Sequence, residues 1–533
     1  MPGRAHKITP ARCNNEIRDK ISKLCIKASD VLDISTISRI DGFVTKENEI
    51  ILIDPNSLTG MGPASFLFHE AAEYGMSHTQ LINFLIESEL QRYGMVDMVD
   101  VNNETEIGGA GKATQVENKI KVVVLIGGDS NEREISLESG RNICYKLSPQ
   151  KYEIIPVFVN DNMELFKLSQ KQLIQNSTRE INESVTSEMQ IKWSGLPKIC
   201  DFVFIGLHGG KGESGAVQGT LEMLNLPYNG SGVLASALCM DKFKTNSYLR
   251  GLGFEAPLSI LISKNIWQDS DLVAKENLVR DFVAEVGFPL ILKPHDDGCS
   301  FFVKKAIDMQ NLITSIDAYF NESPKEQALL EEFVKGIELT VGVFGNENVV
   351  ALPPTMTVAK KEILSILEKF LPGDGENQTP APISASATAL VQDVMARAFR
   401  AVGCCGYARI DCFYQTAEQS RTGKERVVIL EFNTLPGMTP ATCIFHQAAE
   451  IGMKPMEFVD KIVELGLQRS QQVNKVVEPH GNIIEPKAEA KKVDEPVIVP
   501  KRRKKSEQEA SDVKLAGENS TPVIDDKFTM TLF

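Results

Sequence analysis

The sequence lacks the features of a membrane or secreted protein. None of its apolar runs reaches the roughly 18 residues that a membrane-spanning helix requires. Its first residues, M-P-G-R-A-H-K, contain no apolar core of the kind found in a signal peptide. We therefore expect a cytoplasmic protein without a membrane span.

Paired cysteines and an excess of positive charge are also missing. The 10 cysteines are scattered, and none forms the CxxC pair typical of zinc or redox motifs. Reduced thiols in a cytoplasmic protein explain this pattern most simply. The 57 basic residues are outnumbered by 71 acidic ones, which gives a net charge of −14. That balance argues against a general nucleic-acid binder, so we expect no specific nucleic-acid partner.

What the sequence does contain is a pair of apolar runs that carry charged residues at two-residue spacing. Arg409 and Asp411 lie two apart in the first run, and Glu431 and Asn433 repeat this spacing in the second. Residues two apart on a strand share one face, and the polar stretch 415–426 is typical of a hairpin connection. The hairpin would gather two carboxylates and an amide, a set suited to Mg²⁺ or Mn²⁺, beside a fixed cation. The alternative is a hairpin with a solvated polar face.

Two further segments predict βα units whose turns face a ligand. The β-branched run Lys119–Gly127 precedes a Gly-rich turn and a helix expected near Ile135–Leu147. Asp201–Gly232 repeats this order, with His208 at the end of its strand. The first turn matches neither a GxGxxG nor a P-loop pattern. Glu132, in the first turn, is on spacing alone a charge favoured by a helix N-terminus, and a lone histidine such as His208 is often structural.

The N-terminal 95 residues contain an internal repeat. Ile51–Met76 aligns without a gap to Val428–Met453, with 13 of 26 positions identical. Upstream, I-S-R-I-D-G-F-V matches Y-A-R-I-D-C-F-Y. The repeat keeps the four polar residues of the hairpin as Arg39, Asp41, Asp54 and Asn56. Because it has no room for nucleotide-binding strands, we expect a structural or docking role, or a part in assembly, rather than a second active site.

The segments R-I-D and E-F-N-T-L-P-G-M-T, together with H-G-G-x-G-E-S-G, resemble the D-alanine–D-alanine ligases over about residues 119–470. The resemblance implies an α/β ATP-grasp ligase with an N-terminal Rossmann-like (pre-ATP-grasp) α/β domain, a central α+β lobe and a C-terminal α+β catalytic lobe. The segments expected are the partial duplicate of the ligase C-terminal segment (1–95), a linker (96–118), the N-terminal α/β substrate domain (119–237), the central lobe (238–327), the catalytic lobe (328–470) and a disordered tail (471–533). The basic run at 501–505 in this tail is most simply solvated, with nucleic acid or a membrane surface as the alternative partner.

The resemblance also implies roles for individual residues. The predicted partners are D-alanine, ATP and two Mg²⁺ (or Mn²⁺) ions, in a homodimer. Residues implied to take part in catalysis are Glu132, Arg409, Gly437, Lys369, Cys299 and Ser300. Those implied to bind the two amino acids are Glu132 and His208 for the first, and Thr442 and Phe370 for the second. Those implied to bind ATP are Lys242 and Lys293 at the phosphates, Glu331, Phe333 and Val334 at the adenine, and Glu338 at the ribose, with the metal ions on Asp411, Glu431 and Asn433.

Three residues depart from the family pattern. Cys299 replaces the first serine of the phosphate-covering loop, Phe302 replaces a glycine, and Phe370 replaces a tyrosine that belongs to a triad with that serine and Glu132. We expect Phe302 to stiffen the lid or narrow the pocket. The predicted activity is ATP-dependent ligation of two D-alanines through an acyl phosphate, for peptidoglycan precursor synthesis. The first alternative is D-alanine–D-lactate ligation, because family members with phenylalanine at this position include such ligases, or another ATP-grasp carboxylate–amine ligation. The second is a catalytically impaired nucleotide-binding scaffold.

Overall fold

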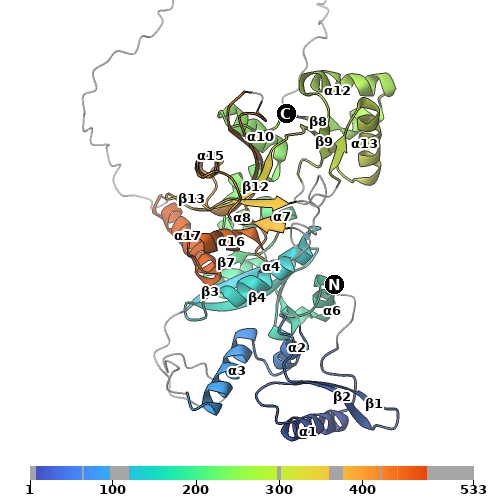
Figure 1. The fold of residues 1–533 in the computed structure, drawn as a ribbon, viewed down its shortest axis with the longest axis vertical. Coiled ribbons are helices and arrows are strands. Elements are labelled where there is room, and N and C mark those ends of the chain that lie inside the picture. Colours follow the sequence, from blue (N-terminus) through green and yellow to red (C-terminus); the bar gives the residue numbers. More distant parts are fainter. Residues whose placement is uncertain are drawn as a thin grey trace, which may run out of the picture. The chain divides into compact units, whose positions relative to one another are not determined.

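The computed structural model of the 533-residue chain is shown in Figure 1. It describes residues 8–62, 65–95, 119–296, 302–358, 376–420, 422–440 and 442–476. The expected linker and most of the expected tail lie outside the described residues. So do four of the predicted site residues, which are Cys299, Ser300, Lys369 and Phe370. Within the described part of the chain, no helix is long and apolar enough to span a membrane.

The N-terminal α/β domain is built on a five-stranded sheet in the order β6-β5-β4-β3-β7. Strand β3 pairs in parallel with both β4 and β7, as its continuous apolar run predicts. Helix α4 begins at Arg133, two residues before the predicted start. The elements are β3 (Ile120–Gly127), α4 (Arg133–Lys146), β4 (Tyr152–Val159), β5 (Leu165–Lys167), α5 (Gln170–Leu173), α6 (Thr178–Ser184), β6 (Gln190–Ile191), β7 (Phe202–Ile205), α7 (Gly210–Glu213), α8 (Ala216–Met223) and α9 (Val233–Met240).

The central lobe is a four-stranded sheet in the order β10-β9-β11-β8, with a hydrophobic core of its own. The predicted boundary at residue 328 is wrong for one strand. Strand β11 pairs with β8 and β9 and so belongs to this sheet, because pairing partners rather than chain position decide which sheet a strand joins. The elements are α10 (Lys242–Gly251), β8 (Ser259–Ser263), α11 (Lys264–Gln268), α12 (Leu272–Val286), β9 (Leu290–Lys293), β10 (Lys304–Ala306), α13 (Met309–Glu322) and β11 (Gln327–Glu332).

The catalytic lobe holds a sheet in the order β15-β14-β12-β16-β17, with β13 paired to β12. Its last helix continues to Val476, past the point at which the sequence predicts a disordered tail. The elements are β12 (Ile337–Gly345), β13 (Val350–Ala351), β14 (Thr355–Val358), β15 (Glu376–Gln378), α15 (Ala385–Ala401), β16 (Gly406–Gln415), β17 (Arg426–Asn433), α16 (Cys443–Glu450) and α17 (Pro455–Val476).

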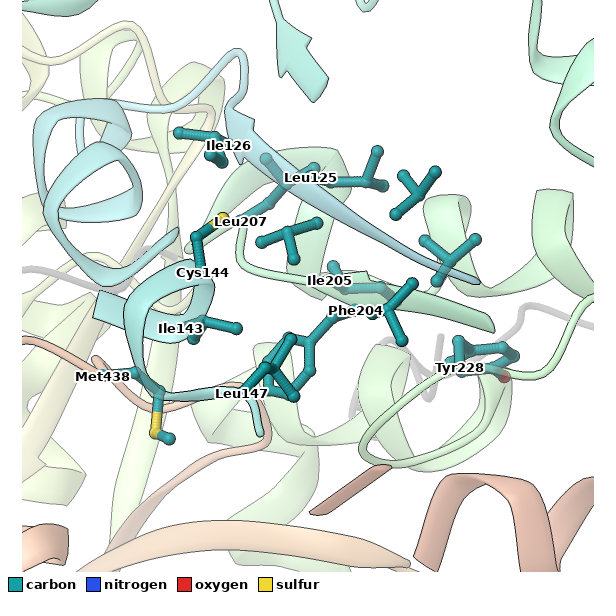
Figure 2. Close-up of a cluster of buried hydrophobic side chains, with 14 of the residues drawn as sticks. Leu125, Ile126, Ile143, Cys144, Leu147, Phe204, Ile205, Leu207, Tyr228 and Met438 are labelled. Atoms are coloured by element: carbon teal, nitrogen blue, oxygen red, sulfur yellow. The ribbon is translucent and has the colours of Figure 1, made fainter. Parts of the chain in front are cut away.

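The catalytic lobe and the N-terminal domain share one hydrophobic core. Met438, from the loop after β17, is fully buried beside Ile143 and Leu147 of the N-terminal domain (Figure 2). Phe458 of α17 belongs to the same cluster. The loop that follows the catalytic hairpin is therefore anchored in the N-terminal domain.

The N-terminal repeat reproduces the end of the catalytic lobe element by element. Its elements are α1 (Asn15–Val31), β1 (Arg39–Val44), β2 (Ile50–Asn56), α2 (Phe66–Glu73) and α3 (His78–Arg92), which correspond in order to α15, β16, β17, α16 and α17. The register repeats as well, with Arg39 opposite Asn56 and Asp41 opposite Asp54. Among the described residues β1 pairs with β2 alone, whereas β16 lies between β12 and β17.

Candidate active site

The predicted hairpin is confirmed, and its register places the four polar residues on one face. Strands β16 and β17 are antiparallel, with Arg409 opposite Asn433 and Asp411 opposite Glu431. The strands end at Gln415 and begin again at Arg426, the predicted limits of the connection. Directly opposed residues of an antiparallel pair lie on the same side of the sheet, so the four side chains form one cluster.

Two cations neutralise the carboxylates of this cluster. Arg409 donates from Nε to Asp411 Oδ1 at 3.1 Å and from Nη2 to Oδ2 at 3.0 Å. Lys242, from the N-terminus of α10, places Nζ 3.2 Å from Glu431 Oε2. Burial opposes the charge on Arg409, but Asp411 and Glu431 outweigh it and raise the pKa of the guanidinium above its ordinary value. Arg409 is therefore a permanent positive charge at this site.

Asp241 fixes the start of helix α10 and so positions Lys242. Its side chain caps the helix by accepting from Lys244 N at 3.0 Å, and the backbone N–H of Lys242 donates to the His295 carbonyl at 2.8 Å. Burial raises the pKa of Asp241, but bonds from His295 and Lys244 outweigh burial and lower it to about 2. This carboxylate consequently stays ionised and keeps the lysine at the edge of the hairpin.

The donor set of the hairpin fits a hard divalent cation. Asp411 and Glu431 contribute carboxylate oxygens from adjacent strands, and Asn433 contributes an amide, which are ligand types that Mg²⁺ and Mn²⁺ accept. The amide nitrogen of Asn433 is buried without a partner among the described residues, so this side chain is available to a ligand. No cluster of three Asp, Glu, His or Cys side chains in the described residues is placed to hold a metal ion. The predicted site would thus depend on ligand oxygens to complete its shell.

A hydrogen-bond chain holds the loop that contains Gly437. Nδ1 of His208 lies 2.8 Å from the Leu435 carbonyl, which can only accept, so we assign the proton to Nδ1. Nε2 then accepts from Ser139 Oγ at 2.8 Å, and that hydroxyl accepts in turn from Met438 N at 2.9 Å. The loop on both sides of Gly437 is therefore tied to the N-terminal domain.

His208 holds this loop through hydrogen bonds as a neutral imidazole, rather than contributing a positive charge. Its ring is 6% exposed, and burial together with the nearby Arg409 lowers its pKa to about 4, although the Leu435 carbonyl opposes this shift. The resemblance implies that His208 binds the first amino acid, but it does not do so as a cation here, because both ring nitrogens are engaged by protein groups and the ring is uncharged at neutral pH. Its position at the end of β7 matches the prediction.

Glu213 holds the same loop, a role that the sequence analysis did not assign. Its Oε1 accepts from Leu435 N at 3.2 Å and its Oε2 accepts from Gly209 N at 3.0 Å. Burial, reinforced by the nearby Glu132, raises the pKa of Glu213 to about 7. The one available signal was its place in the motif H-G-G-x-G-E-S-G, five residues after His208.

Glu132 faces the strand-end loop that follows β7. A Cβ added to Gly209, whose φ is +64°, would lie 2.7 Å from Glu132 Oε2. Glycine is thus needed here for both its backbone conformation and the close approach of the carboxylate. Glu132 is 8% exposed and immediately precedes α4, with its backbone N–H bonded to Ser130 Oγ at 3.1 Å. Glu132 thus places a carboxylate beside this loop, which is suited to an ammonium group.

The predicted nucleotide residues meet where the central and catalytic sheets adjoin. Lys293 Nζ on β9 lies 2.7 Å from Glu331 Oε1 on β11, and the second carboxylate oxygen of Glu331 is buried without a partner among the described residues. Phe333 and Val334 lie in the connection from β11 to β12, and Glu338 lies on β12. A free acceptor beside a lysine, at the junction of two sheets, suits a purine amine next to phosphates.

Phe302 packs into the core of the central lobe, while residues 297–301 of the loop that it was expected to stiffen lie outside the described residues. Its backbone φ is +63°, in the left-handed region that favours glycine, which agrees with the glycine of the family pattern. The ring, however, packs against Tyr319 at 5.9 Å between centroids and joins the core of the central lobe. The substitution therefore adds packing to the lobe at the expense of backbone strain.

Two threonines in the stretch N-T-L-P-G-M-T present unused hydroxyls. Thr434 is 1% exposed and Thr439 is 7% exposed, and neither hydroxyl has a partner among the described residues. Thr442 occupies the N-cap position of α16 and is also buried. Buried hydroxyls without partners are costly unless a ligand satisfies them, so this stretch points to a polar ligand.

The hairpin of the N-terminal repeat lacks these surroundings. Arg39 Nε lies 3.2 Å from Asp41 Oδ1, but the two side chains are 40% and 45% exposed, against 13% and 11% for Arg409 and Asp411. The repeat therefore has the same strand register as the site, but its charged side chains are more exposed to solvent.

Comparison with known proteins agrees with this geometry. A family model described as "D-ala D-ala ligase C-terminus" matches residues 2–87 and again 255–464, and one described as "D-ala D-ala ligase N-terminus" matches residues 121–231. The split match confirms the predicted partial duplication of the ligase C-terminal segment.

Individual relatives match the same part of the chain. The D-alanine–D-alanine ligase of Desulforudis audaxviator is 34% identical over 353 residues, which is 66% of this chain and 99% of the relative. That of Leptospira interrogans is 32% identical over 363 residues, or 66% and 99% of the two chains.

Solved structures show the predicted ATP-grasp ligase fold. The VanG D-Ala:D-Ser ligase from Enterococcus faecalis matches with a TM-score of 0.55 and 26% identity, over 65% of this chain and 99% of its own. The D-alanine–D-alanine ligase from Bacillus anthracis complexed with ATP matches with a TM-score of 0.50 and 27% identity, over 66% and 99%. The motifs, the geometry and both family models agree, and the chain belongs to the D-alanine–D-alanine ligase family.

Proposed function

We propose that this protein joins two D-alanines to D-alanyl-D-alanine at the expense of ATP, in the cytoplasm, for peptidoglycan precursor synthesis. The observation that carries the proposal is the hairpin face on which Arg409, Asp411, Glu431 and Asn433 lie together, with Lys242 in contact. The unpartnered hydroxyls of the adjoining loop support a substrate at this position. The family membership and the ATP complex of a similar ligase agree with this activity.

The residues are suited to bind ATP and activate a carboxylate. Lys242 and Lys293 exchange their present carboxylate partners for phosphate oxygens, while Glu331 accepts from the adenine amine and Glu338 from the ribose. Divalent metal ions held by Asp411, Glu431 and Asn433 would supply further positive charge against the phosphates. The γ-phosphoryl group moves to a carboxylate oxygen of the first D-alanine, which yields ADP and an acyl phosphate. Glu132 holds the ammonium group of that substrate.

The second step forms the peptide bond. The amine of the second D-alanine attacks the acyl carbon, and inorganic phosphate leaves. Arg409 and the backbone N–H of Gly437 stabilise the oxyanion that forms in between, and the chain from His208 through Ser139 to Met438 holds that N–H in place. The hydroxyl of Thr442 binds the carboxylate of the second substrate.

A second candidate function is ligation with a different second substrate. Phe370 replaces the tyrosine of the family pattern, and a D-Ala:D-Ser ligase is among the similar structures. Loss of that hydroxyl and of the serine at Cys299 removes two polar partners of Glu132 in the implied triad. We therefore propose relaxed choice of the second substrate, with D-lactate as an alternative acceptor. Exclusive dipeptide formation with D-lactate in excess, at and below neutral pH, would contradict it.

The test is to incubate the purified protein with ATP, Mg²⁺ and D-alanine, with and without D-lactate. Phosphate release is followed over time and the products are identified by mass spectrometry. D-Alanyl-D-alanine formation supports the ligase. Turnover only in the presence of D-lactate supports a depsipeptide ligase. No turnover in either arm would overturn both and favour a nucleotide-binding scaffold.

A further inference from the structure

Helix α2 of the repeat buries one face more than its counterpart α16 does. His69 and Ala72 on α2 are buried, at 6% and 7% exposure, whereas the same residue types at the matching positions of α16, His446 and Ala449, are exposed. The face that packs inward is common to both, since Phe68 and its counterpart Phe445 are buried. The helix of the repeat therefore has a second contact that its copy does not make.

That second contact is made with the N-terminal domain of the ligase. Helix α2 contacts α5, and Glu73 Oε1 lies 2.7 Å from Lys171 Nζ. At the start of α3, the ring of His78 lies 4.2 Å from that of Tyr145 on α4, and it also stacks on Phe68 at 3.7 Å. The repeat is thus seated on a surface formed by α4 and α5.

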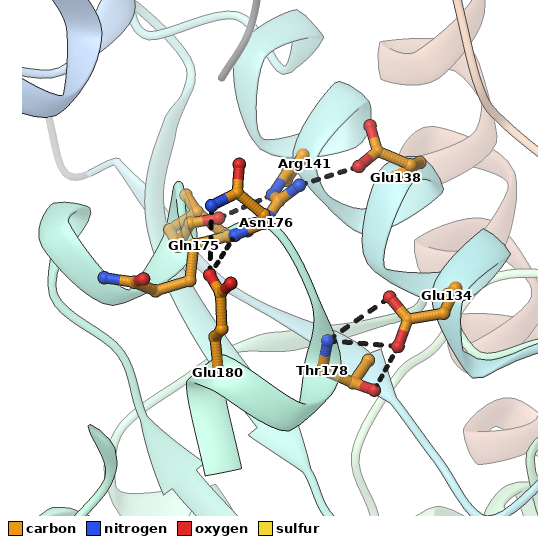
Figure 3. Close-up of polar contacts among 8 residues, drawn as sticks. Glu134, Glu138, Arg141, Gln175, Asn176, Thr178 and Glu180 are labelled. Atoms are coloured by element: carbon orange, nitrogen blue, oxygen red, sulfur yellow. Dashed lines mark hydrogen bonds and ion pairs between the residues drawn. The ribbon is translucent and has the colours of Figure 1, made fainter. Parts of the chain in front are cut away.

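The surface on α4 and α5 is held rigid by the N-terminal domain itself. Arg141 donates to the Leu173 carbonyl at 2.6 Å, to Glu138 at 2.7 Å, and to the Gln175 carbonyl. Glu134 accepts from the backbone N–H of Thr178 at 3.1 Å (Figure 3). These bonds connect α4 to the segments that hold α5 and α6, and none of them involves the repeat.

The ligase module, residues 119–476, carries both halves of the α2–α5 contact, although the position that matches His78 is Pro455. It has the α4–α5 surface, and it has the outer face of α16, where His446, Ala449 and Glu450 repeat His69, Ala72 and Glu73. We propose that the N-terminal repeat occupies, within one chain, the docking site for the α16 face of a second copy of the ligase module. When one protomer carries both surfaces, two modules can contact each other reciprocally about a two-fold axis.

The proposal replaces the homodimer expected from the sequence. In the full chain the α4–α5 surface is already covered by the repeat, so a second copy has no site there and the chain is monomeric. Release of the repeat exposes the surface, and two chains then associate through α16. Ile451 and Met456, which are 46% and 43% exposed beside that face, are the apolar residues that such association would cover.

The test uses one substitution at two matched positions of the full chain. Ala72→Arg places a long charged side chain in the buried contact, while Ala449→Arg places it on the exposed face of the copy. Sedimentation velocity over a range of concentrations measures the mass, and hydrogen exchange of α2 and α3 reports whether the repeat is seated. Because neither readout is catalytic, the result is independent of the proposed ligase activity.

The expected results separate the two halves of the proposal. The unmodified chain and Ala449→Arg sediment as one chain of 58.8 kDa with α2 and α3 protected. Ala72→Arg loses that protection and shifts toward twice the mass as concentration rises. The double variant loses protection but stays at the mass of one chain, because the docking face of α16 is blocked.

Three outcomes would overturn the proposal. The first is a dimer of the unmodified chain that Ala449→Arg does not affect, and the second is unchanged protection in Ala72→Arg. The third is lost protection without any increase in mass. Glu73→Lys, a surface change that does not disturb folding, breaks the ion pair with Lys171 and is expected to act in the same direction to a smaller extent. Glu73→Lys then serves as the test of the docking proposal if Ala72→Arg fails to fold.

Discussion

His208 and Glu213 are expected to make stability depend on pH in opposite directions. The pKa of His208 is lowered from 6.5 to about 4, so below pH 6.5 the unfolded chain binds a proton that the folded chain does not. Its contribution is present above pH 6.5 and is lost as the pH falls toward 4. The pKa of Glu213 is raised from 4.5 to about 7, so its contribution is present below pH 4.5 and is lost as the pH rises through 7.

Between pH 5 and 6.5 the two groups change the free energy of unfolding with pH by equal and opposite slopes, which cancel. A substitution that removes one group leaves the slope of the other to be measured. Each slope is about 1.4 kcal/mol per pH unit, because the folded and unfolded states differ by one bound proton at each group in this range. Glu213→Gln removes the falling slope and leaves that of His208. The variant is therefore expected to lose about 2 kcal/mol more than the unmodified protein when the pH is lowered from 6.5 to 5. A pH-independent loss is also expected, because glutamine offers one oxygen to two backbone N–H groups.

The measurement is urea unfolding at several pH values, followed by the fluorescence of Trp193. This residue lies in the N-terminal domain and donates to the Met163 carbonyl at 2.9 Å. Replacing Trp267 of the central lobe with phenylalanine in every protein isolates that signal. Glu153→Gln, at an exposed carboxylate on β4, is the matched control and should follow the unmodified curve. Parallel curves for Glu213→Gln and the unmodified protein between pH 5 and 6.5 would refute the reasoning.

Three further changes test the site itself. Ser139→Ala orphans the buried N–H of Met438 and is expected to cost about 2 kcal/mol in urea unfolding; it should also slow phosphate release, and unchanged stability would show that the loop is held elsewhere. Asp411→Asn is expected to lower phosphate release by at least about 100-fold, while Asp41→Asn at the matching position of the repeat leaves the rate unchanged; equal effects would place a second site in the repeat. Phe370→Tyr is expected to raise the ratio of dipeptide to depsipeptide when D-alanine and D-lactate compete, as measured by mass spectrometry, and an unchanged ratio would separate this residue from substrate choice.

The catalytic hairpin could be predicted because its information is local. Strand residues alternate between two faces, so the spacing of Arg409 and Asp411, and of Glu431 and Asn433, determined which side chains would meet. The turn chemistry between them gave the limits of the connection. The repeat was visible for the same reason, since it is a comparison of two short segments.

What the sequence could not predict depends on partners that are distant in the chain. His208 lies at the predicted strand end, but its role follows from Leu435 and Ser139, which are 227 and 69 residues away. Strand β11 was placed in the wrong sheet because its pairing partners precede it. For Phe302 the glycine-like backbone was foreseeable, whereas the direction of the ring depended on the position of Tyr319.

The burial of Met438 in the N-terminal domain has a consequence for recombination between ligases. The N-terminal domain and the catalytic lobe share one core, whereas the central lobe has its own. A chimera that exchanges residues 119–237 alone would break side-chain complementarity around Met438 and Phe458. The segment from β8 to β11 can be exchanged with its core intact, whereas α10 places Leu249 in the core of the catalytic lobe. Recombination between relatives is therefore expected to be tolerated at points on either side of this segment of the central lobe. The N-terminal domain and the catalytic lobe are expected to come from the same parent.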